Sequence, residues 1–502
     1  MSRPILGIDF GTTNTAAAYF GDDGRLRLVR VTDKSHVMPS VVWYHAADKA
    51  LVGHGARTQI IDDPRHTVFE AKRFLGRRFQ SEFVAKNRDR FAFDLVEGED
   101  GYCAVLTYDR VTPLVETAHL VIQQMLTLAN HQAGEPFAEC VLTMPAHATF
   151  RQREAMRRAA EKAGLTVRAI INEPTAAALY YANLRNPQQT VLIFDLGGGT
   201  FDATLMSVEN RVVKVLATGG DAFLGGANFD ACIAERLVGD FQEKHGIDLR
   251  ENRLVMQRLL FAAESAKIAL SSVEERHIRI PCVAQKDGRF VDLEYTLTRK
   301  AMEELCFQLI ERTAAVCDDV LTRAGLKAED VDELVLVGGQ TRMPAIRNRF
   351  AHFKRFSSDK DVHPELGVAV GAAILGRNLA RGASGLADVV PMPISVMMPG
   401  GGTHEVISAN SQVPCTKSIM LEGLPPWQAP VPIAIFESLD TTSIEREIFG
   451  TVHVPVEWRV GARGSPSLQL ELGHDFTLKA KLIAPDGRMA PATIVEMRAG
   501  GR

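Results

Sequence analysis

Three apolar runs in the chain each lead into a glycine-rich turn. They cover residues 5–8, 191–194 and 334–337, and a glycine follows each run within three residues. Runs so rich in Val, Ile, Leu and Phe predict strands that are buried on both faces. The first two runs share an order of apolar residues, Asp, a spacer, Gly and then Thr. This internal repeat predicts two related halves, each with a hairpin that reaches toward a shared site.

Helical patterns lie between these predicted strands. Residues 151–164 indicate a helix that ends at Gly164, because glycine commonly terminates helices. Residues 175–181 indicate a helix with Pro174 at its start, and residues 254–271 a longer helix rich in Ala and Leu. Strands that alternate with helices predict an α/β fold for this part of the chain.

The pattern changes after about Arg377. Small, flexible residues within 381–391 are typical of a linker. Beyond them the chain predicts an all-β domain of sandwich type, with short strands at residues 431–436, 452–460, 468–472 and 476–483. We therefore expect three parts, at residues 1–380, 381–391 and 392–498.

Composition narrows the classes of function. The chain has 502 residues, which is too many for one hydrophobic core. Its formal net charge of -4 gives no global positive field for nucleic acid, and no apolar run is long enough to span a bilayer. The run at residues 5–8 is too short for a signal peptide, and the seven cysteines are scattered without a CxxC pair. We therefore expect a cytoplasmic protein that binds neither nucleic acid nor membranes.

The first hairpin carries a candidate phosphate site. Gly11 allows the backbone to approach an anion, and the next three residues offer hydroxyl, amide and backbone N–H donors: Thr12, Thr13 and Asn14. Asp9, at the end of the strand, can hold a hydrated Mg2+ that shields phosphate charge. Taken alone, the segment fits a tight hairpin with a solvated Asp equally well, because short glycine motifs are common.

The second hairpin gives the stronger signal. Three consecutive glycines weaken a hairpin after a buried strand, unless backbone N–H groups must approach a phosphate closely. These glycines are Gly197, Gly198 and Gly199. Asp195 matches Asp9 as a partner of the metal shell, and Thr200 and Asp202 stand where they can orient an attacking water. A flexible hairpin tip does not explain why this pattern repeats the N-terminal one.

Six segments, taken in order, resemble those of a known family. They are residues 8–14, 69–80, 170–178, 194–202, 223–230 and 335–344. Through them the chain resembles the 70-kDa heat-shock chaperones of the DnaK type, from Ile5 to about Arg377 and more weakly to about Arg498. The resemblance implies an α/β actin-like ATPase fold of two related lobes, followed by a small all-β sandwich. Residues 266–272 are closer to the bacterial members of the family.

The resemblance implies ATP and ADP as ligands, with Mg2+ and K+ as ions. Lys72 matches the lysine that reaches the γ-phosphate and the attacking water, and Glu173 matches a carboxylate that positions water or metal. The other catalytic residues implied are Thr200 and Asp202. Without the resemblance, Lys72 would be a solvated surface lysine, and Glu173 an acid that favours a helix N-terminus.

The resemblance also implies the rest of a nucleotide site. Three residues match groups that hold the ribose and adenine, and their i, i+3, i+7 spacing puts them on one helix face: Glu264, Lys267 and Ser271. The turn and guanidinium that flank the base are matched by Gly338, Gly339 and Arg342. A loop near the phosphates is matched by Gly225 and Gly226. The alternative for the helix is an exposed face with a Glu–Lys pair.

Communication between the two parts is implied by a further pair. Pro145 and Arg153 match a relay that reports the γ-phosphate; without the resemblance they indicate a strand-end turn and a helix surface residue. Residues 384–388 are less apolar than the family linker, which predicts weaker coupling. Asn172 is kept where J-domain proteins bind the family, but the neighbouring family Arg is Ala169 here, which leaves recognition of a J-domain protein open.

The implied partners are unfolded client polypeptides, a J-domain co-chaperone and a nucleotide exchange factor. The family's helical lid has no counterpart before Arg502, which predicts weak, fast-exchanging peptide binding. Four functions are compatible with such a chain: an ATP-driven chaperone, a specialised ATPase whose β-domain binds one dedicated partner, a sugar or small-acid kinase, and an actin-like filament protein. The β-domain, Lys72 and residues 173–175 favour the first two over the others.

Overall fold

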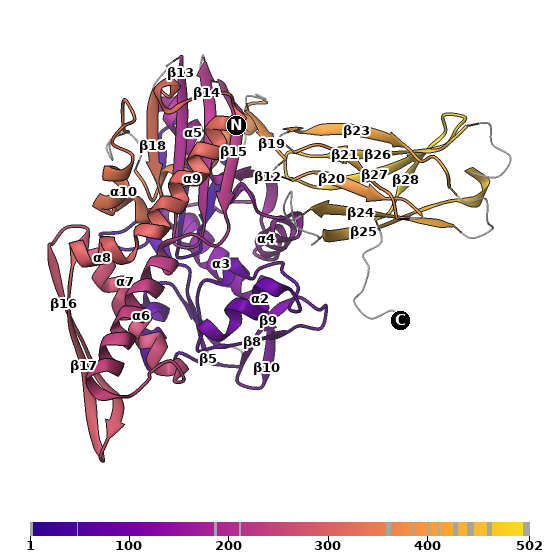
Figure 1. Ribbon diagram of the computed structural model, residues 1–502. Coiled ribbons are helices and arrows are strands. Elements are labelled where there is room, and N and C mark those ends of the chain that lie inside the picture. The colour runs from indigo at the N-terminus through magenta and orange to yellow at the C-terminus, as the bar shows by residue number, and fades with distance from the viewer. Residues whose placement is uncertain are drawn as a thin grey trace.

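The computed structural model has a mixed α/β part followed by a β part (Figure 1). It describes residues 4–47, 49–184, 188–209, 212–357, 363–382, 386–390, 392–399, 401–409, 411–424, 430–438, 446–458 and 464–494. Two six-stranded sheets form the centre of the first part, and two four-stranded sheets form the second. Within these residues, no helix is long and apolar enough to cross a membrane.

The first six-stranded sheet is built around the N-terminal hairpin. β1 runs antiparallel to β2 and parallel to β11, and both hairpin strands are buried along most of their length. The strands, in sheet order, are β12 (Thr166–Asn172), β11 (Glu139–Met144), β1 (Leu6–Phe10), β2 (Asn14–Phe20) and β3 (Leu26–Leu28), with β4 (Val37–Pro39) also on β2.

The second six-stranded sheet repeats this arrangement. β13 runs antiparallel to β14 across a glycine-rich turn and parallel to β18, as β1 does with β2 and β11. The strands, in order, are β18 (Glu333–Val337), β13 (Gln189–Leu196), β14 (Phe201–Glu209), β15 (Val212–Asp221), β19 (Leu386–Val389) and β22 (Gln412–Val413). The two hairpins predicted from the sequence are therefore equivalent elements of two similar sheets.

Two helices, α5 (Glu173–Leu184) and α11 (Gly367–Ala380), join the sheets through one apolar core. Their close crossing depends on a glycine, because a Cβ on Gly371 would lie 1.7 Å from the carbonyl oxygen of Ala176. Gly7 likewise lets β1 lie against α11, since a Cβ there would lie 2.3 Å from the amide nitrogen of Ala373. The two halves are thus held at a short, fixed distance behind the hairpins.

Helices and smaller sheets surround this centre. The first half carries β5 (Val42–Ala46), β6 (Lys49–Val52), α1 (His54–Asp62), β7 (Thr67–Val68), α2 (Glu82–Asn87), β8 (Asp94–Glu97), β9 (Cys103–Thr107), β10 (Arg110–Pro113), α3 (Leu114–Ala133) and α4 (Phe150–Lys162). The second half carries α6 (Gly226–His245), α7 (Arg253–Leu270), β16 (Glu275–Lys286), β17 (Arg289–Thr298), α8 (Arg299–Leu305), α9 (Phe307–Arg323) and α10 (Pro344–Arg349).

The helices predicted from the sequence are present. α4 begins after Thr149, whose side chain accepts the amide of Gln152 while the Gln152 side chain accepts the amide of Thr149, as in a capping box. α5 starts at Glu173, two residues before the predicted start, because Pro174 fits the first helical turn. α7 matches the predicted helix at 254–271 to within one residue at each end.

The β part consists of two antiparallel sheets whose strands alternate buried and exposed side chains, most clearly in β26 and β27. One sheet holds β21 (Thr403–Ile407), β20 (Ile394–Met397), β24 (Val431–Ser438) and β25 (Arg446–Val454), and the other β23 (Cys415–Met420), β26 (Ser467–Leu472), β27 (Leu478–Ile483) and β28 (Met489–Ala492). The strand predicted at 452–460 instead ends at Val454, before a 3-10 turn at Val456–Trp458; residues 459–460 lie outside the described residues.

The expected linker contains a strand. β19 runs parallel to β15, with Val213 opposite Leu386, and antiparallel to β22, with Val389 opposite Gln412. Residues 383–385 and 391 of the expected linker lie outside the described residues. Residues 386–389 therefore connect the second six-stranded sheet to the β part by backbone pairing on both edges of one strand.

Candidate functional site

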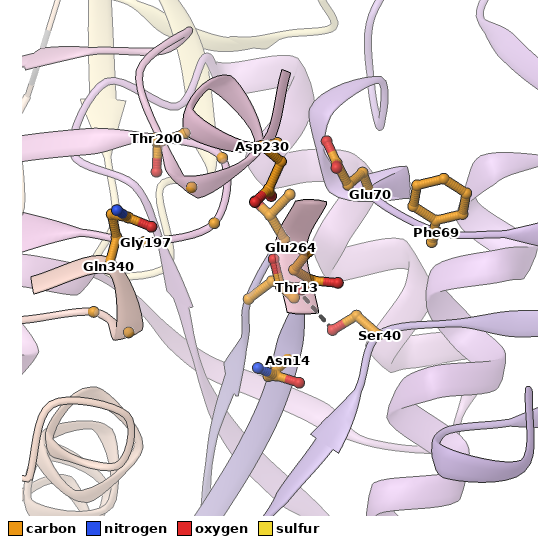
Figure 2. A pocket seen from close by; sticks show the side chains of 18 of the residues that line it. Thr13, Asn14, Ser40, Phe69, Glu70, Gly197, Thr200, Asp230, Glu264 and Gln340 are labelled. Atoms are coloured by element: carbon orange, nitrogen blue, oxygen red, sulfur yellow. Dashed lines mark hydrogen bonds between the residues drawn. The ribbon is translucent and has the colours of Figure 1, made fainter. Parts of the chain in front are cut away.

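A cavity of about 510 Å3 opens between the tips of the two hairpins. Figure 2 shows Thr200 and Gln340 on one side of it and Phe69 and Glu70 on the other. Nearly all the residues that the sequence assigned to a nucleotide line this cavity: Asp9, Gly11, Thr12, Thr13, Asn14, Lys72, Glu173, Asp195, Gly197, Gly198, Gly199, Thr200, Gly226, Glu264, Lys267, Ser271, Gly338, Gly339 and Arg342. Of the residues assigned to the nucleotide or its hydrolysis, Asp202 and Gly225 do not line it, and neither do the two relay residues, Pro145 and Arg153.

The hairpin tips touch, and glycine is what allows the contact. A Cβ on Gly198 would lie 1.9 Å from the Thr13 hydroxyl oxygen, and one on Gly199 would lie 2.7 Å from that of Thr12. Gly225 packs behind the second tip, where a Cβ would lie 2.5 Å from the carbonyl carbon of Gly199. Gly198 and Gly199 therefore let the second tip pack closely against the Thr12 and Thr13 side chains of the first.

Ser40 holds the first tip in place, a role that no sequence motif predicted. Its amide donates to the carbonyl oxygen of Thr13 at 2.8 Å, and its hydroxyl donates to that of Gly11 at 2.8 Å. Both Ser40 and Thr13 face the cavity (Figure 2). With these carbonyls held by Ser40, the turn has a fixed shape before any ligand binds.

Lys72 and Glu173 form a buried ion pair at the cavity wall. The Lys72 ammonium lies 2.5 Å from a Glu173 carboxylate oxygen, and the two side chains are 5% and 12% exposed. Lys72 comes from a 3-10 turn at Ala71–Arg73, and Glu173 is the first residue of α5. Each charge is thus removed from water and compensated by the other.

Several carboxyl groups surround the single ammonium group of Lys72. The pKa of Asp9 is raised to about 7, chiefly by burial and also by the charge of Glu173, while Lys72 and a hydrogen bond from Thr143 oppose the rise. Burial also raises the pKa of Asp195 well above its ordinary value, and the charges of Glu173, Asp202 and Asp9 add to this rise. Such a cluster favours added positive charge. Within the described residues, no three acidic, His or Cys side chains converge as direct ligands of one metal ion.

The α7 side of the cavity contains two further ion pairs. Glu264 accepts from Arg57 at 2.7 Å, and Lys267 lies 2.9 Å from Asp230 and donates to the carbonyl oxygen of Gly226 at 2.9 Å. Burial raises the pKa of Asp230 to about 7 although Lys267 opposes the rise. Asp230 belongs to a motif that the sequence identified without giving it a role. Arg57 had no sequence signal, because it meets Glu264 from 207 positions away.

Pro145 and Arg153 lie together outside the cavity. The Arg153 guanidinium, 1% exposed, donates to the carbonyl oxygens of Pro145 at 3.3 Å and Ala148 at 3.1 Å and to the Asn172 side chain at 2.7 Å. It also lies 4.1 Å from the centre of the Phe476 ring in the β part. The alternative of a helix surface residue is therefore wrong for Arg153, because its position in α4 faces the β part.

Asp202 lies in β14, behind the second hairpin tip and opposite Asp195 in the β-ladder. It is 1% exposed, and one of its carboxylate oxygens lies 2.9 Å from Nδ1 of His147. Asp202 therefore does not reach the cavity surface, where the sequence had predicted that it would orient an attacking water. The His147 contact had no sequence signal.

The N-terminal end of α4 contacts the β part at several points. The amide of Phe150 donates to Glu437 at 2.9 Å, and the Arg151 guanidinium donates to the carbonyl oxygen of Phe449 at 2.5 Å. Further along α4, Arg157 forms an ion pair with Asp475 at 2.6 Å. The helix that carries Arg153 thus contacts the β part along its length.

Comparison with known proteins adds two findings. The family model "Hsp70 protein" matches residues 5–475. The mitochondrial 70-kDa heat shock protein of Dictyostelium discoideum is 33% identical over 509 aligned positions, which cover 100% of this chain and 76% of the relative.

These findings correct one prediction and leave another without support. The relative is named as a mitochondrial protein, so the cytoplasmic location predicted from the sequence is contradicted and withdrawn. The closer resemblance of residues 266–272 to bacterial members of the family is not confirmed either. With a family model over most of its length and a relative that matches it from end to end, the chain belongs to the Hsp70 family of ATP-hydrolysing chaperones.

Proposed function

We propose that ATP binds and is hydrolysed in the cavity between the two hairpins. Residues 1–380 would form an actin-like ATPase domain of two lobes, 381–391 the linker, and 392–498 the β-sandwich that binds polypeptide. The proposal is supported by two sheets of like topology whose hairpins meet at one cavity. Ligands commonly lie in a cleft between two such halves.

The triphosphate would lie between the two glycine-rich tips. Backbone N–H groups from residues 11–14 and 197–200, with the Thr12, Thr13 and Thr200 hydroxyls, are the donors suited to phosphate oxygens there. The adenine and ribose would extend along α7, toward Glu264, Lys267 and Ser271, with Arg342 and the turn at Gly338 on the other side. Lys267 already forms an ion pair with Asp230. Its ammonium would therefore contact the ribose either beside Asp230 or in place of it.

Mg2+ fits the cluster of carboxyl groups as a hydrated ion. Asp9 and Asp195 have pKa values raised by burial and by neighbouring carboxyl groups, so a cation beside them would relieve an existing charge surplus. Because no three acidic, His or Cys side chains converge in the part of the chain that the structure describes, both carboxylates would hold the ion through its water shell. When bound, Mg2+ supplies charge neutralisation for the phosphates. A further requirement for K+ is a separate prediction, to be tested by replacing K+ with Na+.

The residues of this chain would act by positioning. Transfer of a phosphoryl group to water depends mainly on orientation and charge stabilisation, with little covalent participation by protein. The Lys72 ammonium, fixed against Glu173, would donate to the γ-phosphate and orient the attacking water, while Thr200 would donate from the opposite tip. Glu173 would thereby keep Lys72 in one place rather than abstract a proton itself.

The β part would bind client polypeptides and sense the nucleotide through α4. Arg153, which contacts both the Pro145 carbonyl and the Phe476 ring, is the residue best placed for that communication. A J-domain co-chaperone and a nucleotide exchange factor are proposed as partners on the family pattern. Asn172 is buried against Arg153 and the Val389 carbonyl here, so a J-domain protein would need a different conformation to reach its side chain.

The buried Lys72–Glu173 pair carries this proposal and sets its experiment. ATP hydrolysis would be measured for the wild type, Lys72→Ala and Lys86→Ala, each with and without an unfolded peptide; Lys86 is an exposed lysine that pairs with Glu82. We expect Lys72→Ala to lower the rate by about 100-fold or more. Lys86→Ala should match the wild type. Hydrolysis that survives in Lys72→Ala would contradict the proposed site.

The same experiment separates two kinds of β-domain. Stimulation by generic unfolded peptide is the result expected of a general chaperone. Stimulation by one native protein alone would assign the β part to a dedicated partner. The kinase alternative would require phosphate transfer to a small molecule, and neither comparison supports it.

A further inference from the structure

His147 is a polar residue that has no role in the hydrolysis proposed above. It stands between the first six-stranded sheet and α4, two residues after Pro145. Its ring is 19% exposed, and Nδ1 lies 2.9 Å from a carboxylate oxygen of Asp202. A carboxylate oxygen accepts hydrogen bonds, so this contact is a hydrogen bond in the tautomer whose Nδ1–H donates to Asp202.

The second sheet leaves room for this contact. Gly220 lies directly opposite Asp202 in the pairing of β14 with β15. A Cβ on Gly220 would lie 3.1 Å from His147 Nδ1 and 2.9 Å from the Asp202 carboxylate. Any larger residue at Gly220 would therefore crowd the hydrogen bond, which indicates that the two sheets are shaped around it.

Asp202 is tied to the hydrolytic site from the other side. It faces Asp195 across the β-ladder, and its negative charge is one of the causes that raise the pKa of Asp195. A change in the orientation of the Asp202 carboxylate would therefore alter the field at Asp195 and at the cavity. The hydrogen bond from His147 fixes that orientation.

The loop that carries His147 is held by Arg153. The Arg153 guanidinium donates to the carbonyl oxygens of Pro145, Ala146 and Ala148, on both sides of His147. The same guanidinium lies under the ring of Phe476 in the β part. His147 is thus the residue of this loop whose side chain reaches the second lobe at Asp202.

We infer that His147 is a positioning residue for ATP hydrolysis, which holds the Asp202 carboxylate in the orientation that the hydrolytic site requires. The inference rests on the proposed function, because it takes the cavity beside Asp195 as the place of hydrolysis. His147 contacts neither substrate nor metal in this role. It acts through Asp202. Because Arg153 holds the loop that carries His147, a movement of that loop would move the Asp202 carboxylate.

The test compares two replacements of His147 in the full chain. His147→Leu removes the donor, whereas His147→Asn keeps an N–H donor of similar reach. Hydrolysis is followed in a single turnover of bound ATP, and the ATP dissociation constant is measured separately. His66→Leu is the matched control, because His66 also donates to a carboxylate, that of Asp63 at 2.8 Å, outside the cavity lining.

We expect His147→Leu to slow the single-turnover rate by about tenfold, the size typical when a group that orients a functional residue is lost. ATP affinity should stay within about twofold, and His147→Asn should recover most of the lost rate. His66→Leu should match the wild type.

Three results would overturn the inference: a wild-type rate in His147→Leu, an equal loss in the Leu and Asn variants, or a loss of ATP affinity as large as the loss of rate. Failure of the proposed function is recognised separately. It would appear as undiminished hydrolysis in Lys72→Ala, whatever the His147 variants do.

Discussion

The backbone amide of Phe150, in the first turn of α4, donates to the carboxylate of Glu437 at 2.9 Å, although the two residues are 287 positions apart. Glu437 lies in β24 of the β part and is 3% exposed. A buried carboxylate at a helix N-terminus binds unsatisfied amides and the positive end of the helix dipole. This contact therefore joins the two parts at the helix that also carries Arg153.

Replacing Glu437 by Ala should loosen the β part from α4. Hydrogen exchange at the amides of residues 150–153 should speed up, because the Phe150 amide loses its acceptor and the helix start loses a favourable charge worth about 0.3–1 kcal/mol. Glu457→Ala, at an exposed carboxylate of the β part, is the control and should leave this exchange unchanged. Unchanged exchange in both variants would mean that the contact does not hold the two parts together in solution.

Lys72 and Glu173 should be coupled in stability. Lys72→Met leaves a buried carboxylate without its cation and should lower the free energy of unfolding by about 3 kcal/mol. Adding Glu173→Gln removes that charge, so the double variant should be more stable than Lys72→Met alone. Urea unfolding of the four proteins of this cycle, without nucleotide, measures the coupling.

The control for that cycle is the exposed Lys86–Glu82 pair of α2, whose side chains are 69% and 65% exposed. Exposed pairs are screened by water, so no measurable coupling is expected there. A strictly additive result for Lys72 and Glu173 would contradict the buried pair.

Asp230 should make stability depend on pH. Its pKa in the folded protein is raised to about 7, mainly by burial, so the folded state holds a proton that the unfolded state releases near the ordinary value of 3.8. A raised pKa contributes stability below the unfolded value, and this contribution is lost as pH rises toward 7. Asp230→Asn should therefore flatten the fall in unfolding temperature of the nucleotide-free protein between about pH 4 and pH 7. An unchanged slope would show that Asp230 is already ionised in that range.

Gly371 should tolerate no side chain. A Cβ there would lie 1.7 Å from the Ala176 carbonyl oxygen, so Gly371→Ala must push α5 and α11 apart. The expected loss is about 3 kcal/mol in the free energy of unfolding, the upper end for overpacking a core. Gly239→Ala in α6 is the matched control, because its new Cβ would meet nothing within 4 Å and alanine favours the helix. Equal stability of the two variants would contradict the close crossing.

Local pattern accounts for the parts of this fold that could be predicted from the sequence. The two hairpins were recognisable because their strands are almost wholly apolar and their turns repeat the same order of residues. The helices α4 and α5 were recognisable from a glycine at the end of one and a proline at the start of the other, and α7 from a long run rich in Ala and Leu. The strand in the expected linker was not, because β19 is stabilised by partners on both edges that only the folded chain supplies.

The candidate site divides in the same way. Residues within one motif, such as those of the glycine-rich turns, could be assigned from the sequence because their spacing is part of the chemistry. Pairs from distant segments could not be derived from the residues alone: Lys72 meets Glu173 from 101 positions away, and Arg57 meets Glu264 from 207. Ser40 and His147 act on the backbone and on a buried carboxylate, and neither role leaves a pattern in the sequence.

The two-sided pairing of β19 has a consequence for any state in which the mixed α/β part and the β part are separated. If β19 leaves β15, the second sheet is left with an open edge, and the backbone of β19 itself is open on one side. Open edges invite pairing with any extended chain nearby, including another copy of this protein. Each separation would thus create a short-lived template for self-association. The tendency of this protein to aggregate would then depend on how long its two parts stay apart.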